Sequence, residues 1–143
     1  MTFTFFQKLT LGIAGASALA VGLSILAVPQ AFYASYGIAL GGDVNLLSEL
    51  RAPAAGLCAL GAVMLIGIWH DRWRETSIVA AFTVFLAFPA GRIIGLIVDG
   101  IPSGSVMGAL ILELVIAALC LAAFGRRPRT VRDDRCNPQS ARV

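Results

Sequence analysis

Four long apolar stretches, separated by short polar segments, dominate the pattern of the chain. They cover Leu9–Val28, Ala52–Trp69, Ser77–Val98 and Val106–Phe124. Each is close to the roughly 20 residues that an α-helix needs to cross about 30 Å of hydrocarbon. The pattern predicts an all-α fold, an integral membrane four-helix bundle formed by one domain over residues 1–125. Residues 126–143 are basic and include Pro128 and Pro138, which predicts a disordered cytoplasmic tail.

Small residues four apart predict how these helices pack, because they let helix backbones approach closely in lipid. They are Gly12, Ala16, Ala20 and Ser24, with Ala14, Ala18 and Gly22 beside them; Ala54, Cys58 and Ala62, with Ala52 and Gly56; and Ala87, Gly91 and Gly95. Pro89 interrupts the third stretch, where it either kinks the helix or is simply tolerated. The sequence therefore predicts a tight bundle with little room for a wide pore.

Aromatic residues mark the expected membrane interfaces, since Tyr and Trp prefer the headgroup level. Trp69 and Trp73 flank the turn between the second and third stretches. Phe32, Tyr33 and Tyr36 follow Pro29 on the opposite side, so that we expect an interfacial loop with a short helix over Phe32–Leu50.

Composition and charge agree with a membrane protein and set its expected orientation. Apolar residues make up 58% and charged residues 13% of the chain, against about 25% charged in a typical soluble domain. Lys8, Arg72, Arg74 and the arginines of the tail lie on one side of the spans, whereas residues 30–50 and 99–105 contain neither Lys nor Arg. The positive-inside rule then places both termini in the cytoplasm. The net charge of +3 comes mostly from the tail, which argues against nucleic-acid binding.

The first stretch has an alternative interpretation as a cleaved signal peptide, because Lys8 precedes an apolar core. That core, Leu9–Val28, is longer than the usual core of about 7–15 residues. Pro29 and the bulky Phe32 and Tyr33 also make a poor cleavage context. We therefore expect the first stretch to remain as a membrane helix.

Two charged side chains inside the apolar stretches are the most informative polar residues. Arg92 lies six residues before the end of the third stretch, and Glu113 lies seven residues after the start of the fourth. At about 1.5 Å per residue, both lie roughly 9–10 Å below the same membrane face if the two helices are antiparallel neighbours. A lone charge at mid-bilayer costs about 2.5–3.5 kcal/mol, so such residues usually pair inside the bundle. The sequence thus predicts a contact between Arg92 and Glu113.

Three further charged residues gather at the outer ends of the same helices. Glu49 and Arg51 open the second stretch, and Asp99 closes the third, seven residues after Arg92 and on nearly the same helical face. With Arg92 and Glu113 they are expected to form one network, whose formal charge of −1 calls for a proton, a bound cation or a cationic ligand. Two interpretations stay open: a structural network that locks the helices together, or a site for a ligand, proton or substrate.

The cysteines and the histidine do not form a recognisable catalytic, redox or metal-binding motif. Cys58 and Cys120 lie within the apolar stretches, Cys136 lies in the tail, and no pair has the spacing of a redox or zinc motif. His70 is the one histidine and lies at the end of a span without a second ligand nearby. No metal site, cofactor, catalytic nucleophile or phosphate-binding loop is predicted.

The order of several motifs resembles a known family. They are Pro29, Phe32-Tyr33, Tyr36-Gly37, Asn45, Glu49-Leu50-Arg51-Ala52, Gly91-Arg92, Asp99-Gly100, Pro102 and Glu113. Over roughly Lys8 to Gly125 the chain resembles a bacterial family of four-helix membrane proteins, domain of unknown function forty-three forty-five. The resemblance implies a multi-pass protein of the bacterial inner membrane without an assigned activity. The family looks related at fold level to DoxX-like membrane proteins, some linked to quinone and thiol oxidation, but a shared fold transfers no chemistry.

These observations favour a non-enzymatic membrane protein, acting as an accessory or as a binding protein for a small molecule or lipid. Arg92 and Glu113 would form the centre of the site, and Glu49, Arg51 and Asp99 would cover it from outside. One alternative is a small proton-coupled transporter in which Glu113 changes protonation. Another is a quinone-binding partner of a membrane oxidoreductase. Expected partners are the bilayer, a lipid or quinone ligand, and another subunit or a second copy of the chain.

Overall fold

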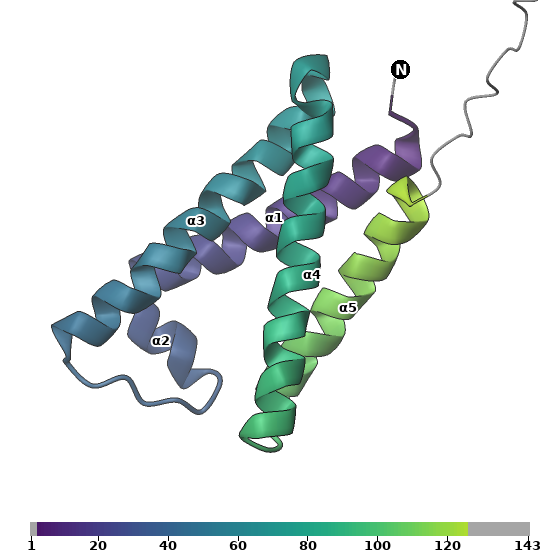
Figure 1. The fold of residues 1–143 in the computed structure, drawn as a ribbon. Coiled ribbons are helices and arrows are strands. Elements are labelled where there is room, and N and C mark those ends of the chain that lie inside the picture. The colour runs from purple at the N-terminus through teal and green to yellow at the C-terminus, as the bar shows by residue number, and fades with distance from the viewer. Residues whose placement is uncertain (1–2, 126–143) are drawn as a thin grey trace, which may run out of the picture.

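The computed structural model describes residues 3–125, and that part of the chain is built from helices and connecting turns (Figure 1). The long helices are α1 (Phe5–Ala27), α3 (Val44–Trp69), α4 (Arg74–Val98) and α5 (Gly104–Phe124). A short helix, α2 (Pro29–Ala34), follows α1, and a single 3-10 turn, η1 (Asp71–Trp73), joins α3 to α4. All four long helices are long and apolar enough to cross a membrane, as expected of a multi-pass protein. The predicted disordered tail lies outside the described residues.

The helix α1 begins before its apolar stretch because polar side chains cap it. The Thr4 hydroxyl accepts a hydrogen bond from the Gln7 N–H at 3.3 Å, and the Gln7 side chain accepts one from the Thr4 N–H at 3.0 Å. This reciprocal pair is a capping box, which satisfies backbone donors that a helix start leaves without partners. Hydropathy alone therefore places the start of α1 too late.

The start of α3 corrects the expected loop over Phe32–Leu50. The short helix lies earlier, at Pro29–Ala34, and α3 already begins at Val44. The carboxylate of Asp43 caps α3 by accepting a hydrogen bond from the Asn45 N–H at 2.9 Å. The first two turns of α3 alternate leucines with Asn45, Ser48 and Glu49, so hydropathy does not extend the apolar stretch back to them.

The helices α1 and α3 pack closely through glycines. A Cβ atom on Gly22 would meet the Ala54 carbonyl oxygen of α3 at 2.8 Å, and one on Gly61 would meet the Leu19 nitrogen of α1 at 2.8 Å. Such approach of two backbones is open only to residues without a side chain at these points. The α1–α3 pair is therefore the tightest part of the bundle.

The structure selects among the predicted stripes of small residues. On α1 the buried stripe contains Ala14, Ala18 and Gly22, which the sequence placed beside the main stripe, whereas Ala16 and Ala20 are exposed. On α4 the predicted stripe does not pack against another helix of this chain, because two of its three members, Ala87 and Gly91, are exposed. The core instead contains larger side chains. They include Leu11, Leu57, Met64, Val84, Phe85 and Ile116.

The helix α1 packs along α3, and α4 packs along α5, and these two pairs diverge toward the end where α2 lies (Figure 1). At the opposite end Phe3 packs edge-on against Phe124 with 5.8 Å between ring centroids, and Gln7 Nε2 donates a hydrogen bond to the Ala123 carbonyl at 2.9 Å. The Arg74 guanidinium lies over the Phe3 ring, 5.0 Å from its centroid. Both ends of the described chain thus lie together, as an even number of spans requires. At the other end α5 separates from α1, and α2 lies on that side of the bundle (Figure 1).

The Gln7 side chain should contribute measurably to this closed end. We expect Gln7→Leu to lower the free energy of unfolding by about 1–2 kcal/mol, because it removes hydrogen bonds to Thr4 and Ala123 that are each worth about 0.5–1.5 kcal/mol. Equilibrium unfolding in detergent micelles measures the loss. Thr4→Ala, which removes only the cap of α1, is the control and should lose less. Equal losses in the two variants would mean that the bond to α5 contributes nothing.

Candidate functional site

The predicted contact between Arg92 and Glu113 is present. Arg92 Nε on α4 donates to both carboxylate oxygens of Glu113 on α5, at 3.1 Å to Oε1 and 3.0 Å to Oε2. The Arg92 side chain is 31% exposed and that of Glu113 is 16% exposed. The pair is therefore partly open to its surroundings, and the Glu113 carboxylate is the more enclosed member.

The turn between α4 and α5 places the two charges at the same level. Asp99 ends α4 with its N–H bonded to the Gly95 carbonyl, and Gly100 follows with φ of +99°, a left-handed conformation that glycine adopts without strain. The turn is short, so α5 returns antiparallel beside α4. Residues at similar distances from the turn, Arg92 before it and Glu113 after it, consequently meet.

The guanidinium of Arg92 uses only part of its bonding capacity. Arginine carries five N–H donors, and within residues 3–125 only the Nε–H of Arg92 forms a hydrogen bond. Among the residues that the structure describes, no acceptor is bonded to Nη1 or Nη2 of Arg92. The terminal nitrogens are therefore available to a group that is not part of the described chain.

A cavity of about 370 Å³ lies beside this ion pair. Its walls come from all four long helices and from the segment around α2, and both Arg92 and Glu113 line it. Gly108, Leu112 and Ile116 follow one another at intervals of four on α5 and, with Glu113, give the cavity one helix face. Most of the remaining lining is aliphatic or aromatic. This combination, an apolar cavity with a few convergent polar groups, is typical of small-molecule sites.

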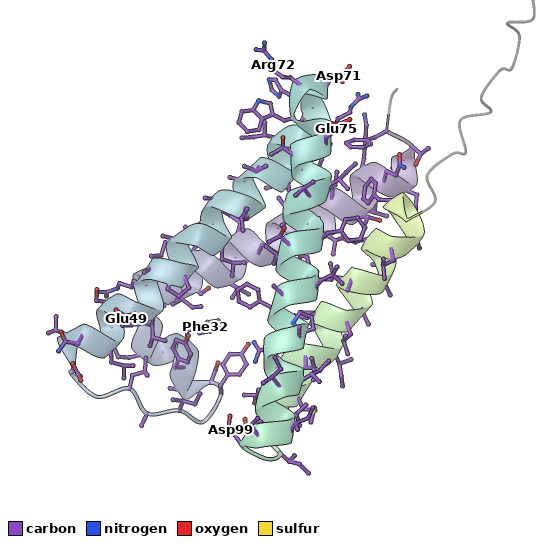
Figure 2. All side chains as sticks on the ribbon, viewed as in Figure 1. Phe32, Glu49, Asp71, Arg72, Glu75 and Asp99 are labelled. Atoms are coloured by element: carbon purple, nitrogen blue, oxygen red, sulfur yellow. The ribbon has the colours of Figure 1, made fainter. Side chains whose placement is uncertain are left out.

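Aromatic side chains of α2 and the turn after it form one wall of the cavity. Phe32, labelled in Figure 2, has its ring centroid 5.4 Å from that of Tyr33 and 5.2 Å from that of Tyr36. The Ser103 hydroxyl donates to the Tyr36 carbonyl at 3.0 Å, which joins this segment to the α4–α5 turn. The sequence assigned the three aromatics to the membrane interface. The separations of three and four residues between Tyr36 and the other two were the available signal that the three rings come together.

The Tyr33 phenol is close enough to Arg92 for the charge of Arg92 to affect its pKa. Burial raises the pKa of the Tyr33 phenol above its ordinary value, and the positive charge of Arg92 partly opposes this rise. The phenol is therefore protonated at neutral pH. It adds an O–H group, which both donates and accepts hydrogen bonds, to the lining of the cavity.

A second, smaller cavity of about 190 Å³ lies between α4 and α5 near their turn. Arg92 lines this cavity as well, together with Asp99, Pro102 and Met107. Arg92 is therefore shared by the two cavities, whereas Glu113 lines only the larger one.

The wider network of five charged residues is not formed. Glu49, Arg51 and Asp99 are exposed, and within residues 3–125 none of them forms an ion pair with Arg92 or Glu113. Figure 2 shows Glu49 near the start of α3 and Asp99 at the end of α4. This part of the prediction is wrong for Glu49 and Arg51 because α3 diverges from α4 toward that end, and for Asp99 because it lies at the exposed end of α4, two turns beyond Arg92. Asp99 alone of the three lines a cavity with Arg92.

The other candidate groups do not converge. Cys58 and Cys120 are both free thiols, and Cys136 lies outside the described residues. The described part of the chain contains no group of three or more His, Cys, Asp and Glu side chains that could hold a metal ion. An ion pair between Asp71 and Arg74 lies at the α3–α4 turn, at the opposite end of α4 from Asp99 (Figure 2).

Comparison with known proteins gave one match. The model of a protein family described as "Domain of unknown function (DUF4345)" matches residues 6–124. Neither the curated proteins nor the solved structures gave a match. The match covers all four long helices and the ion pair, while the fold-level relation to DoxX-like proteins stays a prediction.

Proposed function

Because the chain belongs to the DUF4345 family, whose description assigns no activity, we propose from the site itself that the protein binds a small amphiphilic molecule beside Arg92. It would be a non-enzymatic, multi-pass protein of the bacterial inner membrane with both termini in the cytoplasm. The ligand would occupy the larger cavity, and its polar group would meet the ion pair of Arg92 and Glu113.

The cavity beside the ion pair is the observation that carries this proposal. A pair that only locks α4 to α5 needs no open volume beside it, and helices in lipid normally pack without such a gap. Here about 370 Å³ adjoins the pair, and the terminal nitrogens of Arg92 have no bonded acceptor among the described residues. Exposed lining residues, among them Phe88 and Leu112, belong to the apolar helices, so the opening would face hydrocarbon.

Filling the cavity should abolish ligand binding without harming the fold. A Cβ atom on Gly108, which lines the cavity, would meet nothing within 4 Å, so leucine fits there and would occupy ligand space. We expect a lipid extract from the producing cells to stabilise the purified protein by about 2.7 kcal/mol when a ligand reaches 100 times its Kd. We expect no such stabilisation of Gly108→Leu. Thermal unfolding in micelles measures both.

A matched control lies on the neighbouring helix. A Cβ atom on Gly91 would also meet nothing within 4 Å, and Gly91 lies next to Arg92 in the chain but lines neither cavity. Gly91→Leu should therefore respond to the extract as the unchanged protein does. An equal response of Gly108→Leu and the unchanged protein would refute binding in the cavity.

Two alternatives share the same residues. A quinone matches the aromatic wall and the free donors of Arg92, and a short-chain quinone added alone would then raise the unfolding temperature. A proton-coupled transporter is favoured by one observation, the presence of Arg92 in the lining of both cavities. It predicts that Glu113→Gln folds normally but loses transport in proteoliposomes. An accessory role beside another subunit or a second copy is compatible with each.

A further inference from the structure

The cavity also indicates the chemical class of its ligand. We infer that the ligand is an uncharged amphiphile, with an apolar chain and a head group whose oxygen atoms accept hydrogen bonds from Arg92. An acylglycerol is the simplest example. The inference rests on the proposed function and deepens it, because it specifies the charge of the molecule that the cavity admits.

The charges that face the cavity disfavour both anionic and cationic head groups. Its lining contains one positive group, Arg92, and one negative group, Glu113, in direct contact with each other. An anionic head group would meet Glu113 as it approaches Arg92, and a cationic one would meet Arg92 as it approaches Glu113. Asp99 is exposed and lines only the smaller cavity, so the larger cavity contains one positive and one negative side chain. Because attraction and repulsion balance, a charged head group gains no net electrostatic energy in the cavity. Nothing then offsets the large free-energy cost of removing its charge from water.

The hydrogen-bonding capacity of Arg92 and Glu113 favours a head group with neutral oxygen atoms. The nitrogens Nη1 and Nη2 of Arg92 have no bonded acceptor in the described chain, and the surrounding hydrocarbon offers none. Carbonyl and hydroxyl oxygens meet this need without adding charge. The Glu113 carboxylate has lone pairs beyond those facing Nε and accepts a ligand hydroxyl. The Tyr33 phenol supplies a further hydroxyl among the lining residues.

The size and opening of the cavity indicate that the ligand also has an apolar chain. A volume of about 370 Å³ is near the lower end of the range of small-molecule sites, about 300–1,000 Å³. It accommodates a head group and the start of a chain. Val21, Phe88 and Leu112 line the cavity and are also exposed on the outside of the bundle. The rest of the chain therefore leaves between these residues into the lipid.

Three esters with the same acyl chain test the inference. Oleoylglycerol is neutral, its phosphate monoester is anionic, and oleoylcholine is cationic. Each is added at equal mole fraction to micelles of the full-length protein, and the apparent Kd is taken from the rise in unfolding temperature. We expect oleoylglycerol to bind at least about tenfold more tightly than either charged ester. The Gly108→Leu variant corrects for effects of each ester on the micelle itself.

Two variants that each remove one charge should shift this preference in opposite directions. Glu113→Gln removes the negative charge but keeps the size of the side chain, so the phosphate ester should gain at least about tenfold in affinity relative to oleoylglycerol. Arg92→Gln should shift the preference toward oleoylcholine in the same way. Because each variant is compared with itself across three ligands, a general loss of stability does not affect the ratio.

The outcomes separate the two proposals. If none of the esters stabilises the unchanged protein beyond Gly108→Leu, the binding function itself fails for this class of amphiphile. If a charged ester binds most tightly to the unchanged protein, the cavity binds lipid but the inferred class is wrong. If the preference stays the same in Glu113→Gln and Arg92→Gln, the head group does not meet the ion pair, and the inference is overturned.

Discussion

Replacing Glu113 by leucine is expected to lower the free energy of unfolding by about 2.5–3.5 kcal/mol, because it leaves the charge of Arg92 unpaired among apolar helices. Arg92→Leu should cost a similar amount, since it leaves the carboxylate of Glu113 in the same position. Reversible unfolding of the purified protein in mixed micelles measures both losses. The side chains are 31% and 16% exposed, and both lie on helices long and apolar enough to cross a membrane.

The double variant Arg92→Leu/Glu113→Leu should recover most of the stability that either single change loses. Removing one partner leaves an isolated charge, whereas removing both replaces an ion pair by apolar side chains that suit the surroundings. The difference between the double loss and the sum of the single losses gives the coupling energy of the pair. Simple addition of the two single losses would mean that Arg92 and Glu113 do not stabilise each other.

Replacing Gly61 by alanine is expected to cost about 1–3 kcal/mol, as overpacking of a closely packed contact generally does. The new Cβ would lie 2.8 Å from the Leu19 nitrogen and 2.9 Å from the Gly15 carbonyl oxygen. Both are backbone atoms of α1 and cannot rotate away, so α1 must move from α3 as a whole. Unfolding in micelles measures the cost.

The same helix offers a matched control at Gly56. A Cβ at Gly56 would meet nothing within 4 Å, and replacing a helical glycine by alanine gains about 0.5–1 kcal/mol. Gly56→Ala should therefore be neutral or stabilising. A similar response of the two glycines would show that the close approach of α1 and α3 does not depend on Gly61.

The spans and the ion pair were accessible from sequence for the same reason. The bilayer fixes how many apolar residues a helix needs, so the four stretches locate α1, α4 and α5 to within a few residues and also the end of α3, whose polar-interrupted start they miss. The same rise per residue sets Arg92 and Glu113 at one level once α4 and α5 are antiparallel neighbours. Both predictions depend on distances along helices, and these are determined by local geometry.

Features that depend on directions between helices were not accessible in this way. The sequence joined Glu49, Arg51 and Asp99 to the site because all lie at helix ends, but it contains no signal for the divergence of α3 from α4. It offered two neighbouring stripes on α1 and did not choose between them, since both consist of small residues. The sequence also did not predict the cavity. Its aromatic wall comes from α2 and the turn after it, and aromatic residues there are equally compatible with a membrane interface and with a cavity wall.

Phe88 and Leu112 line the cavity and are exposed on two apolar helices. Their position determines in which phase the ligand concentration that sets the occupancy of the cavity is counted. Under the proposed function, a ligand that reaches the cavity between these two side chains would arrive from the bilayer without crossing water. Its effective concentration is then its mole fraction among membrane lipids, and adding buffer leaves that value unchanged. Adding detergent or lipid lowers it. Occupancy should therefore fall during purification as micelles accumulate, and it should recover when the protein is returned to a membrane of the original composition.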